Sequence, residues 1–306
     1  MIDSAGFFAP HPTDNLGYMD PGGRPEQLIE LPYYVSQTNN VTAHRTTAFV
    51  QDTWRLGLNA GDLDLHLGVR AHRWSALPNP WASERNTHLV GGPRAHASFT
   101  PKAKPLTTYR VSGGWYYQPP FYREMRGFDG QINPEVAPQR AIHAVAGVDH
   151  EFSSKGRPFK VVGELYWKDL DQLIPYEIEN VRQRYYATNN SEGYAAGLDV
   201  LLNGEFIPGI QSWLRMSALT TAEDLVDDSY EEYFNEDGFQ VVPGYHSGTF
   251  AAITDTVLVQ PGMIPRPADQ RFSLSLLFQD EMPRNPDYKV LLSLFYGSGL
   301  PYGPPS

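Results

Sequence analysis

The stretch DLDLHLGVRAH, residues 62–72, decides the fold class of this chain. Its apolar residues fall on every second position, and mostly polar residues fill the positions between them. Because side chains alternate between the two faces of a β-strand, this period of two predicts a strand with one apolar face. The apolar row consists of Leu63, Leu65, Leu67, Val69 and Ala71, and the other row of Asp62, Asp64, His66, Gly68, Arg70 and His72.

The same alternation recurs in residues 142–149, 159–168 and 271–279. With these segments the sequence predicts an all-β, antiparallel chain whose strands are bounded by Gly, Pro, Asn or Asp. The predicted strands are residues 45–56, 62–74, 94–101, 107–118, 139–152, 159–170, 184–206, 212–223, 266–279 and 287–297.

The predicted connections alternate between short and long, and the longest is residues 222–265. Tight turns at one end and long loops at the other are typical of a membrane β-barrel. Lipid would contact the apolar rows, and water or a plug would contact the polar rows, while all backbone groups pair within the sheet. The sequence therefore predicts an antiparallel transmembrane β-barrel. The short connections are residues 57–61, 101–105, 153–158, 207–211 and 280–286.

Aromatic residues support the barrel prediction, since membrane barrels carry aromatic girdles at both lipid–water interfaces. Several large aromatic side chains fall near predicted strand ends, although such residues also fill the cores of β-sandwiches. The candidate girdle residues are Trp54, Trp74, Trp115, Tyr116, Tyr117, Trp167 and Trp213.

The composition excludes several classes of function. The formal charge is −11, from 35 acidic and 24 basic residues, which argues against a nucleic-acid partner because phosphate binding needs a basic surface. The chain has 0 Cys, so disulfides and thiol chemistry are absent. No segment reaches the roughly 18 apolar residues of a transmembrane helix, and residues 290–296 are the longest run of that kind. Residues 1–32 lack the pattern of an export signal, so we expect either that the protein is not exported or that its true beginning lies upstream.

Four segments resemble the barrel of Bacteroidetes-type TonB-dependent outer-membrane receptors. They are WYYQPPFYRE at 115–124, NPEVAPQRAIHAVAGVDHEF at 133–152, the stretch from GELYWKDLDQ to LLNGEF at 163–206, and RPADQRFSLSLLFQ onward at 266–306. The resemblance covers most of residues 45–306. It implies that the chain is the C-terminal part of a 22-stranded barrel, present as a fragment of about ten strands without the plug domain.

The resemblance also implies a function and partners. Such a receptor lies in the bacterial outer membrane and takes up a scarce or bulky ligand, for example a siderophore, oligosaccharide, peptide or vitamin, with energy from the TonB complex. The TonB complex would act through the missing plug, and a surface lipoprotein is a further candidate partner besides membrane lipid. Residues 1–44 are expected to form an extracellular loop, 45–297 the strands and loops, and 298–306 the start of the next loop.

The loop of residues 118–138 is the candidate ligand-binding surface. It combines aromatic rings, an Arg and carboxylates, which suit sugars, peptides or chelates, although Pro119 and Pro120 could equally stiffen a loop whose aromatics only pack on their neighbours. The candidate ligand-binding residues are Tyr116, Gln118, Phe121, Tyr122, Arg123 and Glu124.

Polar residues on the inward rows of the predicted strands are candidates for lining the barrel lumen. A polar lumen also accounts for the scattered His residues, none of which forms a closely spaced pair with a third ligand as zinc requires. The candidate lumen-facing residues are His66, Arg70, His72, Arg110, His143, Asp149, Glu164 and Lys168.

Other chemistry finds little support in the sequence, and we expect no enzyme activity, cofactor or metal site. The acidic run at 223–237 could attract calcium, but its spacing does not match an EF-hand loop and such runs are usually solvated. Asp169, Asp171 and Glu177 could form the carboxylate pair of a glycosidase, although acidic pairs at strand ends are common without catalysis. Nucleotide-binding and serine-hydrolase motifs are absent. A passive porin-like channel and a soluble carbohydrate-active β-protein remain the alternatives.

Overall fold

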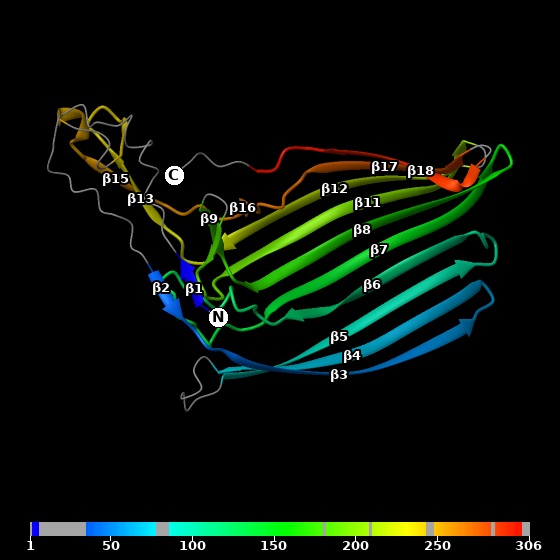
Figure 1. Cartoon of the computed structure of the whole chain (residues 1–306), viewed down its shortest axis with the longest axis horizontal. Helices are drawn as coiled ribbons and strands as arrows, with labels where there is room; N and C mark the ends of the chain where they lie inside the picture. The colour runs from blue at the N-terminus through cyan, green and yellow to red at the C-terminus, as the bar shows by residue number, and fades with distance from the viewer. Residues whose placement is uncertain are drawn as a thin grey trace.

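The computed structural model of the chain describes residues 2–5, 35–77, 86–179, 182–207, 210–242, 248–282 and 285–301. Ten long strands form one antiparallel sheet in the order β18-β17-β12-β11-β8-β7-β6-β5-β4-β3, and the short β16 (Ile264–Pro265) pairs with β12 (Figure 1). Each long strand lies beside its neighbours in the sequence, as in a meander. The long strands are β3 (Thr42–Gly57), β4 (Gly61–Leu77), β5 (Asn86–Pro101), β6 (Thr107–Gln118), β7 (Gln139–Ser154), β8 (Arg157–Leu173), β11 (Ser191–Ile207), β12 (Ile210–Leu225), β17 (Phe272–Met282) and β18 (Asn285–Gly297).

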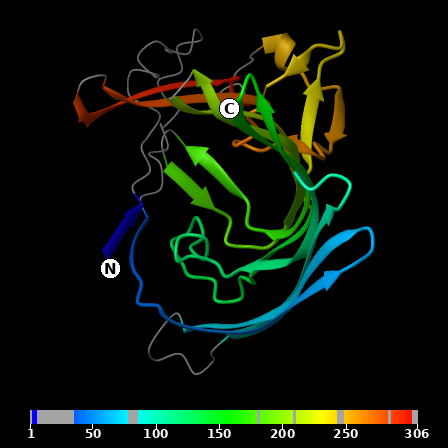
Figure 2. The ribbon, with the colours of Figure 1, turned by 90° about the vertical axis from the view of Figure 1, so that its right-hand side faces the viewer.

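The sheet curves into an open trough and does not close (Figure 2). Among the described residues, β3 pairs only with β4 in this sheet and β18 pairs only with β17. The all-β, antiparallel prediction is therefore confirmed, and the partial barrel matches the expectation of about ten strands from a larger sheet. Within the part of the chain that the structure describes, no helix is long and apolar enough to cross a membrane.

The register confirms that the alternating rows belong to one continuous face. Leu65 on β4 lies opposite Trp54 on β3 and Ala97 on β5, and Leu67 lies opposite Ala95. Further along the same sheet, Leu165 on β8 lies between Ala146 on β7 and Leu198 on β11. Leu274 on β17 lies opposite Met216 on β12 and Tyr296 on β18. Directly opposed residues share a face, so the apolar rows of all ten strands form one surface.

Two groups of aromatic rings border this apolar surface. Near the short turns, Phe159 stacks on Phe152 with centroids 5.4 Å apart and meets Phe206 edge to face at 5.5 Å. Near the long loops, Trp167 stacks on Tyr194 at 5.1 Å. The candidate girdle residues Trp54, Trp115 and Trp167 lie on this face and are exposed.

The girdle prediction is wrong for three residues, because strand alternation turns them to the opposite, polar face. Trp74 is buried there, Tyr116 stacks on His143, and Trp213 lies opposite Asn203 and Leu277. A position near a strand end therefore does not identify a girdle residue by itself, since the parity of the position decides which face it reaches.

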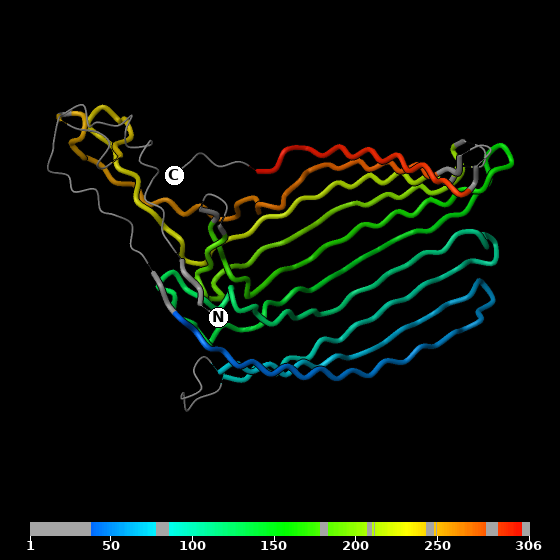
Figure 3. Tube along the Cα trace, in the orientation of Figure 1, coloured from blue at the N-terminus to red at the C-terminus, as the bar shows by residue number. Residues whose placement is uncertain are grey.

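The short connections lie at one end of the trough and the long ones at the other (Figure 3). Lys155 and Gly156 join β7 to β8 with φ of 52° and 76°, as a two-residue type I′ turn requires. At the other end, residues 119–138 fold into the hollow of the trough (Figure 2). The predicted short connections 207–211 and 280–286 fall partly outside the described residues.

The long loops contain strands that the alternation did not predict. β9 (Tyr176–Glu179) and β10 (Arg182–Tyr185) form a hairpin, so the predicted strand 184–206 is wrong at its start, where a loop separates β10 from β11. β13 (Tyr230–Phe234), β14 (Gln240–Val241) and β15 (Asp255–Val259) form a separate small sheet beside the 3-10 helix η1 (Gly248–Ala251). β1 (Ile2–Ala5) pairs with β2 (Val35–Thr38), both inside the predicted N-terminal loop, and β3 already begins at Thr42.

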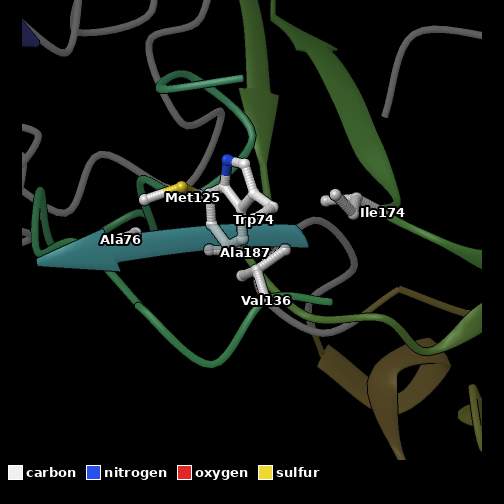
Figure 4. Packing of buried hydrophobic residues seen from close by; sticks show 6 residues of the cluster. All are labelled: Trp74, Ala76, Met125, Val136, Ile174 and Ala187. Carbon is white, nitrogen blue, oxygen red and sulfur yellow. The ribbon is translucent and has the colours of Figure 1, made fainter. Parts of the chain in front are cut away.

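A small hydrophobic core anchors the loops on the polar face (Figure 4). Trp74 and Ala76 of β4 pack with Met125 and Val136 of the loop that follows β6, and with Ile174 and Ala187. Since residues 119–138 enter the hollow, Trp74 and the face that carries it are turned toward the hollow as well. The opposite, apolar face is therefore the outside of the trough.

We expect Leu67→Arg to destabilise the folded barrel, because Leu67 is the central residue of the apolar row of β4 and is 41% exposed on the outer face. An Arg near the bilayer midplane costs about 2–4 kcal/mol. Urea unfolding of the intact barrel in lipid vesicles measures the change in the free energy of unfolding. His66→Arg, one residue along and on the other face, is the matched control and should cost less. A larger loss from His66→Arg than from Leu67→Arg would mean that the facing is reversed.

Candidate functional site

The register places all eight candidate lumen residues on one face of the sheet, which is the face that carries Trp74. His66 lies opposite His96, His143 opposite Lys168, and Glu164 opposite Gly147. Each remaining candidate lies opposite one of these residues or an even number of positions from one on the same strand, so it shares their face. The structure thus brings the eight residues together on the wall of the trough. The eight residues are His66, Arg70, His72, Arg110, His143, Asp149, Glu164 and Lys168.

A network of ion pairs occupies this face near the short turns. Arg110 pairs with Asp149 and with Glu164, the latter at 3.1 Å between Nη2 and Oε1, and the Lys160 ammonium lies 3.2 Å from Asp149 Oδ2. Gly147 lies on β7, between the strands that carry Arg110 and Glu164, and a Cβ there would lie 3.3 Å from Glu164 Cγ, closer than usual packing allows. The absence of a side chain at Gly147 thus leaves room for the bridge, and the charges of this region compensate one another.

Nearer the long loops, the ring of Tyr116 lies between the side chains of Arg94 and His143. The Arg94 guanidinium lies 4.3 Å from the centroid of the Tyr116 ring, and the His143 ring stacks on it at 4.2 Å. A guanidinium over an aromatic face is attracted by the negative face of the ring. Lys168 on the next strand lies 5.3 Å from the ring of Tyr166, so the aromatic rings hold cations along this part of the wall.

A cavity of about 460 Å³ opens at the loop end of the same face. Three of the six candidate ligand-binding residues line it, namely Tyr116, Gln118 and Glu124. A volume of several hundred cubic ångströms and a mixture of aromatic and polar side chains are usual for small-ligand sites. The lining also includes residues that the sequence did not single out as ligand-binding, chiefly Arg140, Tyr176, Tyr185 and Arg266.

Each charged group in this loop-end cavity has a partner or a stabilising contact. Arg140 pairs with Asp171, and the Arg266 Nε atom lies 3.0 Å from Glu223 Oε2. The Glu124 carboxylate accepts the backbone N–H of Phe121 at 2.7 Å and the amide of Gln139 at 3.3 Å. Burial raises the pKa of Glu124 above its ordinary value of 4.5, and these two hydrogen bonds offset part of that rise. Burial also raises the pKa of the Tyr176 and Tyr185 hydroxyls above the ordinary value of 10.0.

The other three candidate ligand-binding residues do not line this cavity. Phe121 is 65% exposed, the Tyr122 hydroxyl accepts a hydrogen bond from Asn39 Nδ2 at 3.3 Å, and the Arg123 carbonyl accepts the N–H of Arg126. Their role as ligand-binding residues stays a prediction. Tyr176 and Arg266 reach the cavity from loops far away in the sequence, and no local pattern marks them.

The carboxylates considered for metal binding or catalysis are spread apart or paired. Asp171 pairs with Arg140, Glu177 lies 3.6 Å from Arg184, and Glu223 pairs with Arg266. In the described ranges, no group of three or more His, Cys, Asp or Glu side chains is placed to hold a metal ion.

Comparisons with known proteins give a family and structural neighbours. The family described as TonB dependent receptor-like, beta-barrel, matches residues 4–300. No curated protein matches the sequence. Among solved structures, the chain is similar to the copper transporter OprC, with a TM-score of 0.52 and 12% identity over 82% of this chain and 34% of that one. The alcaligin outer-membrane receptor FauA from Bordetella pertussis gives a TM-score of 0.47 and 15% identity over 85% of this chain and 38% of that one. The transporter YddB from Escherichia coli gives 0.39 and 7%, over 78% and 40%. The chain therefore spans little more than a third of the length of these neighbours.

We expect the packing of residues 121–138 to weaken as pH rises above about 4.5, because the raised pKa of Glu124 makes the packed loop bind more protons than the unpacked loop. The packed loop is most stable below the ordinary pKa of Glu124, and it loses stability as the pH rises from there through the raised pKa. Glu124→Gln should remove this dependence, while Glu135→Gln in the same loop should keep it. Amide hydrogen exchange of the loop, corrected for the intrinsic effect of pH, measures the change. A slope that Glu124→Gln leaves intact would contradict the assignment.

Proposed function

The chain belongs to the TonB-dependent receptor β-barrel family, and from that premise we propose that it forms part of an outer-membrane transporter for TonB-energised uptake of a scarce or bulky ligand. The observation that carries the proposal is the division of the ten-stranded sheet into an apolar outer face and a polar inner face. Only a lipid surrounding suits an outer face of this kind, since in water it would need a second layer to cover it. We propose a transport role and no catalytic one.

The proposed orientation follows from the asymmetry of the connections. In outer-membrane barrels the short turns face the periplasm and the long loops face the outside. The loop-end cavity, the β9–β10 hairpin and the β13–β15 sheet would then be extracellular, as would the long segment that precedes β3. β4 and β8 have 17 residues each, whereas a tilted strand needs about 9–11 to cross the membrane, so their loop ends would extend beyond the lipid.

The eight co-facial polar residues would line the lumen in this arrangement, and Tyr116, Gln118 and Glu124 would contact ligand that enters from outside. The loop-end cavity supports this role because its aromatic rings and paired charges offer both stacking and hydrogen bonds. A siderophore, oligosaccharide, peptide or vitamin is the proposed ligand class. The TonB complex, acting through a plug domain, and a surface lipoprotein are the proposed partners, and the Bacteroidetes-type assignment stays a prediction.

We expect the intact protein that contains these residues to behave as a closed, TonB-binding receptor. An immobilised periplasmic domain of TonB should retain the detergent-solubilised protein from the outer-membrane fraction, and the same protein in planar lipid bilayers should show no steady conductance. A passive porin would conduct ions continuously and would not bind TonB. Steady conductance together with absence of TonB binding would favour the porin-like alternative, and recovery of the protein in the soluble fraction would favour the carbohydrate-active one.

A further inference from the structure

The polar face carries a second cavity, of about 340 Å³, on the wall formed by β3 to β6. Its hydrogen-bonding side chains come from four adjacent strands, and none of the described residues that line it is Asp or Glu. Tyr116 borders this mid-wall cavity and also the loop-end cavity, so the two spaces meet at one ring. The polar groups that matter here are Gln51, His66, Arg70, Arg94, His96 and Ser112.

Two guanidinium groups in the mid-wall cavity rest on aromatic rings instead of carboxylates. Arg94 lies over Tyr116 at 4.3 Å, and Arg70 lies 5.5 Å from the centroid of Phe49. Among the described residues neither guanidinium forms an ion pair with Asp or Glu, and the buried Nε–H of Arg94 has no hydrogen-bond partner. A buried N–H without an acceptor costs free energy that a ligand oxygen would recover.

Positive charge in this part of the wall is concentrated. Arg45, Arg70 and Arg94 all lie within electrostatic reach of His72, which is on the same face. His66 and His96 add two imidazoles whose ring centroids are 5.4 Å apart. A recess lined by one sign of charge between low-dielectric walls attracts ions of the opposite sign.

Elsewhere on the polar face, several cations are neutralised by neighbouring carboxylates. Near the short turns Arg110 pairs with Asp149 and Glu164, and Lys160 pairs with Asp149. At the loop-end cavity Arg266 pairs with Glu223. The mid-wall cavity is thus the place on the described wall where Arg side chains line a hollow that no carboxylate enters.

We propose that the mid-wall cavity binds an oxyanion, a carboxylate or phosphate group, on the transported ligand. This inference rests on the proposed function, since it names the chemical class of the transporter's cargo. Guanidinium groups match the planar, bidentate geometry of carboxylates and phosphates, and Arg70, Arg94 and the two His side chains supply donors from one wall. A cargo that first occupies the loop-end cavity would pass Tyr116 to reach this anion site.

The test uses citrate and orthophosphate as probes of the intact protein in detergent, with binding measured by isothermal titration calorimetry. We expect both probes to bind the wild type, and the neutral triethyl ester of citrate not to bind. The double variant Arg70→Gln with Arg94→Gln should weaken citrate binding by about tenfold or more, because hydrogen bonds to charged groups contribute that much. Arg94→Lys, which keeps the charge but not the bidentate geometry, should fall between the two.

The matched control is Arg55→Gln, which removes one positive charge from the same face but outside the cavity, where Arg55 lies 3.6 Å from Asp64. It should bind citrate like the wild type, and the change of gel mobility on heating should show that every variant folds. The proposal is overturned if the wild type binds neither probe, if the ester binds as tightly as citrate, or if the double variant retains wild-type affinity. If one of those results is found while the protein still binds TonB and shows no steady conductance, the transport role stands and only the anion site is rejected. If citrate binds as expected but the protein conducts steadily and does not bind TonB, only the transport role is rejected.

Discussion

A hydrocarbon surrounding offers no hydrogen bonds, and this constraint accounts for most of the structure. In lipid, every backbone N–H and C=O of a spanning segment must pair within the sheet, and each unpaired group costs several kcal/mol. The ten-strand meander meets most of this requirement, because each of the eight inner strands pairs with a neighbouring strand on both sides. Outward side chains must be apolar for the same reason, which produces the single outer face and the aromatic groups that border it. Among the described residues, the outer edges of β3 and β18 have no partner strand in this sheet.

The same constraint concentrates most of the charged clusters on the inner face. On the inner face, charged groups gather as compensated pairs around Arg110, as cations stacked on aromatic rings around Tyr116, and as loop contacts around Glu124. The wall therefore changes in character along its height, from balanced charge near the short turns, through uncompensated positive charge in the middle, to a balanced and partly aromatic cavity under the loops. Such a gradient suits a path for a ligand, since each level offers different contacts.

The period of two made the spanning strands predictable. Residues 107–118 were predicted and observed as a strand with the same bounds, and the register places Leu67 and His66 on opposite faces of the sheet. The strand predicted from Arg94 in fact begins at Asn86, because β5 stays paired with β4 past Pro93, where its ladder with β6 ends and the missing N–H of proline is tolerated. The loops were not predictable in this way. Their hairpins are short and stabilised by local contacts, and Trp74, Tyr176 and Arg266 acquire their roles only when distant segments meet.

The central claim is that alternate residues of the long strands face lipid and lumen, and spin-label accessibility tests it most directly. The sequence has 0 Cys, so single cysteines can be placed one at a time at residues 159–168 of β8 in the intact protein, labelled with a nitroxide and reconstituted in lipid vesicles. Collision with oxygen, which concentrates in lipid, should peak at Val161, Leu165 and Trp167, and collision with a water-soluble nickel chelate should peak at Lys160, Glu164 and Lys168. Oxygen collision that peaks at Lys160, Glu164 and Lys168, or accessibility that does not alternate between neighbouring residues, would contradict the account.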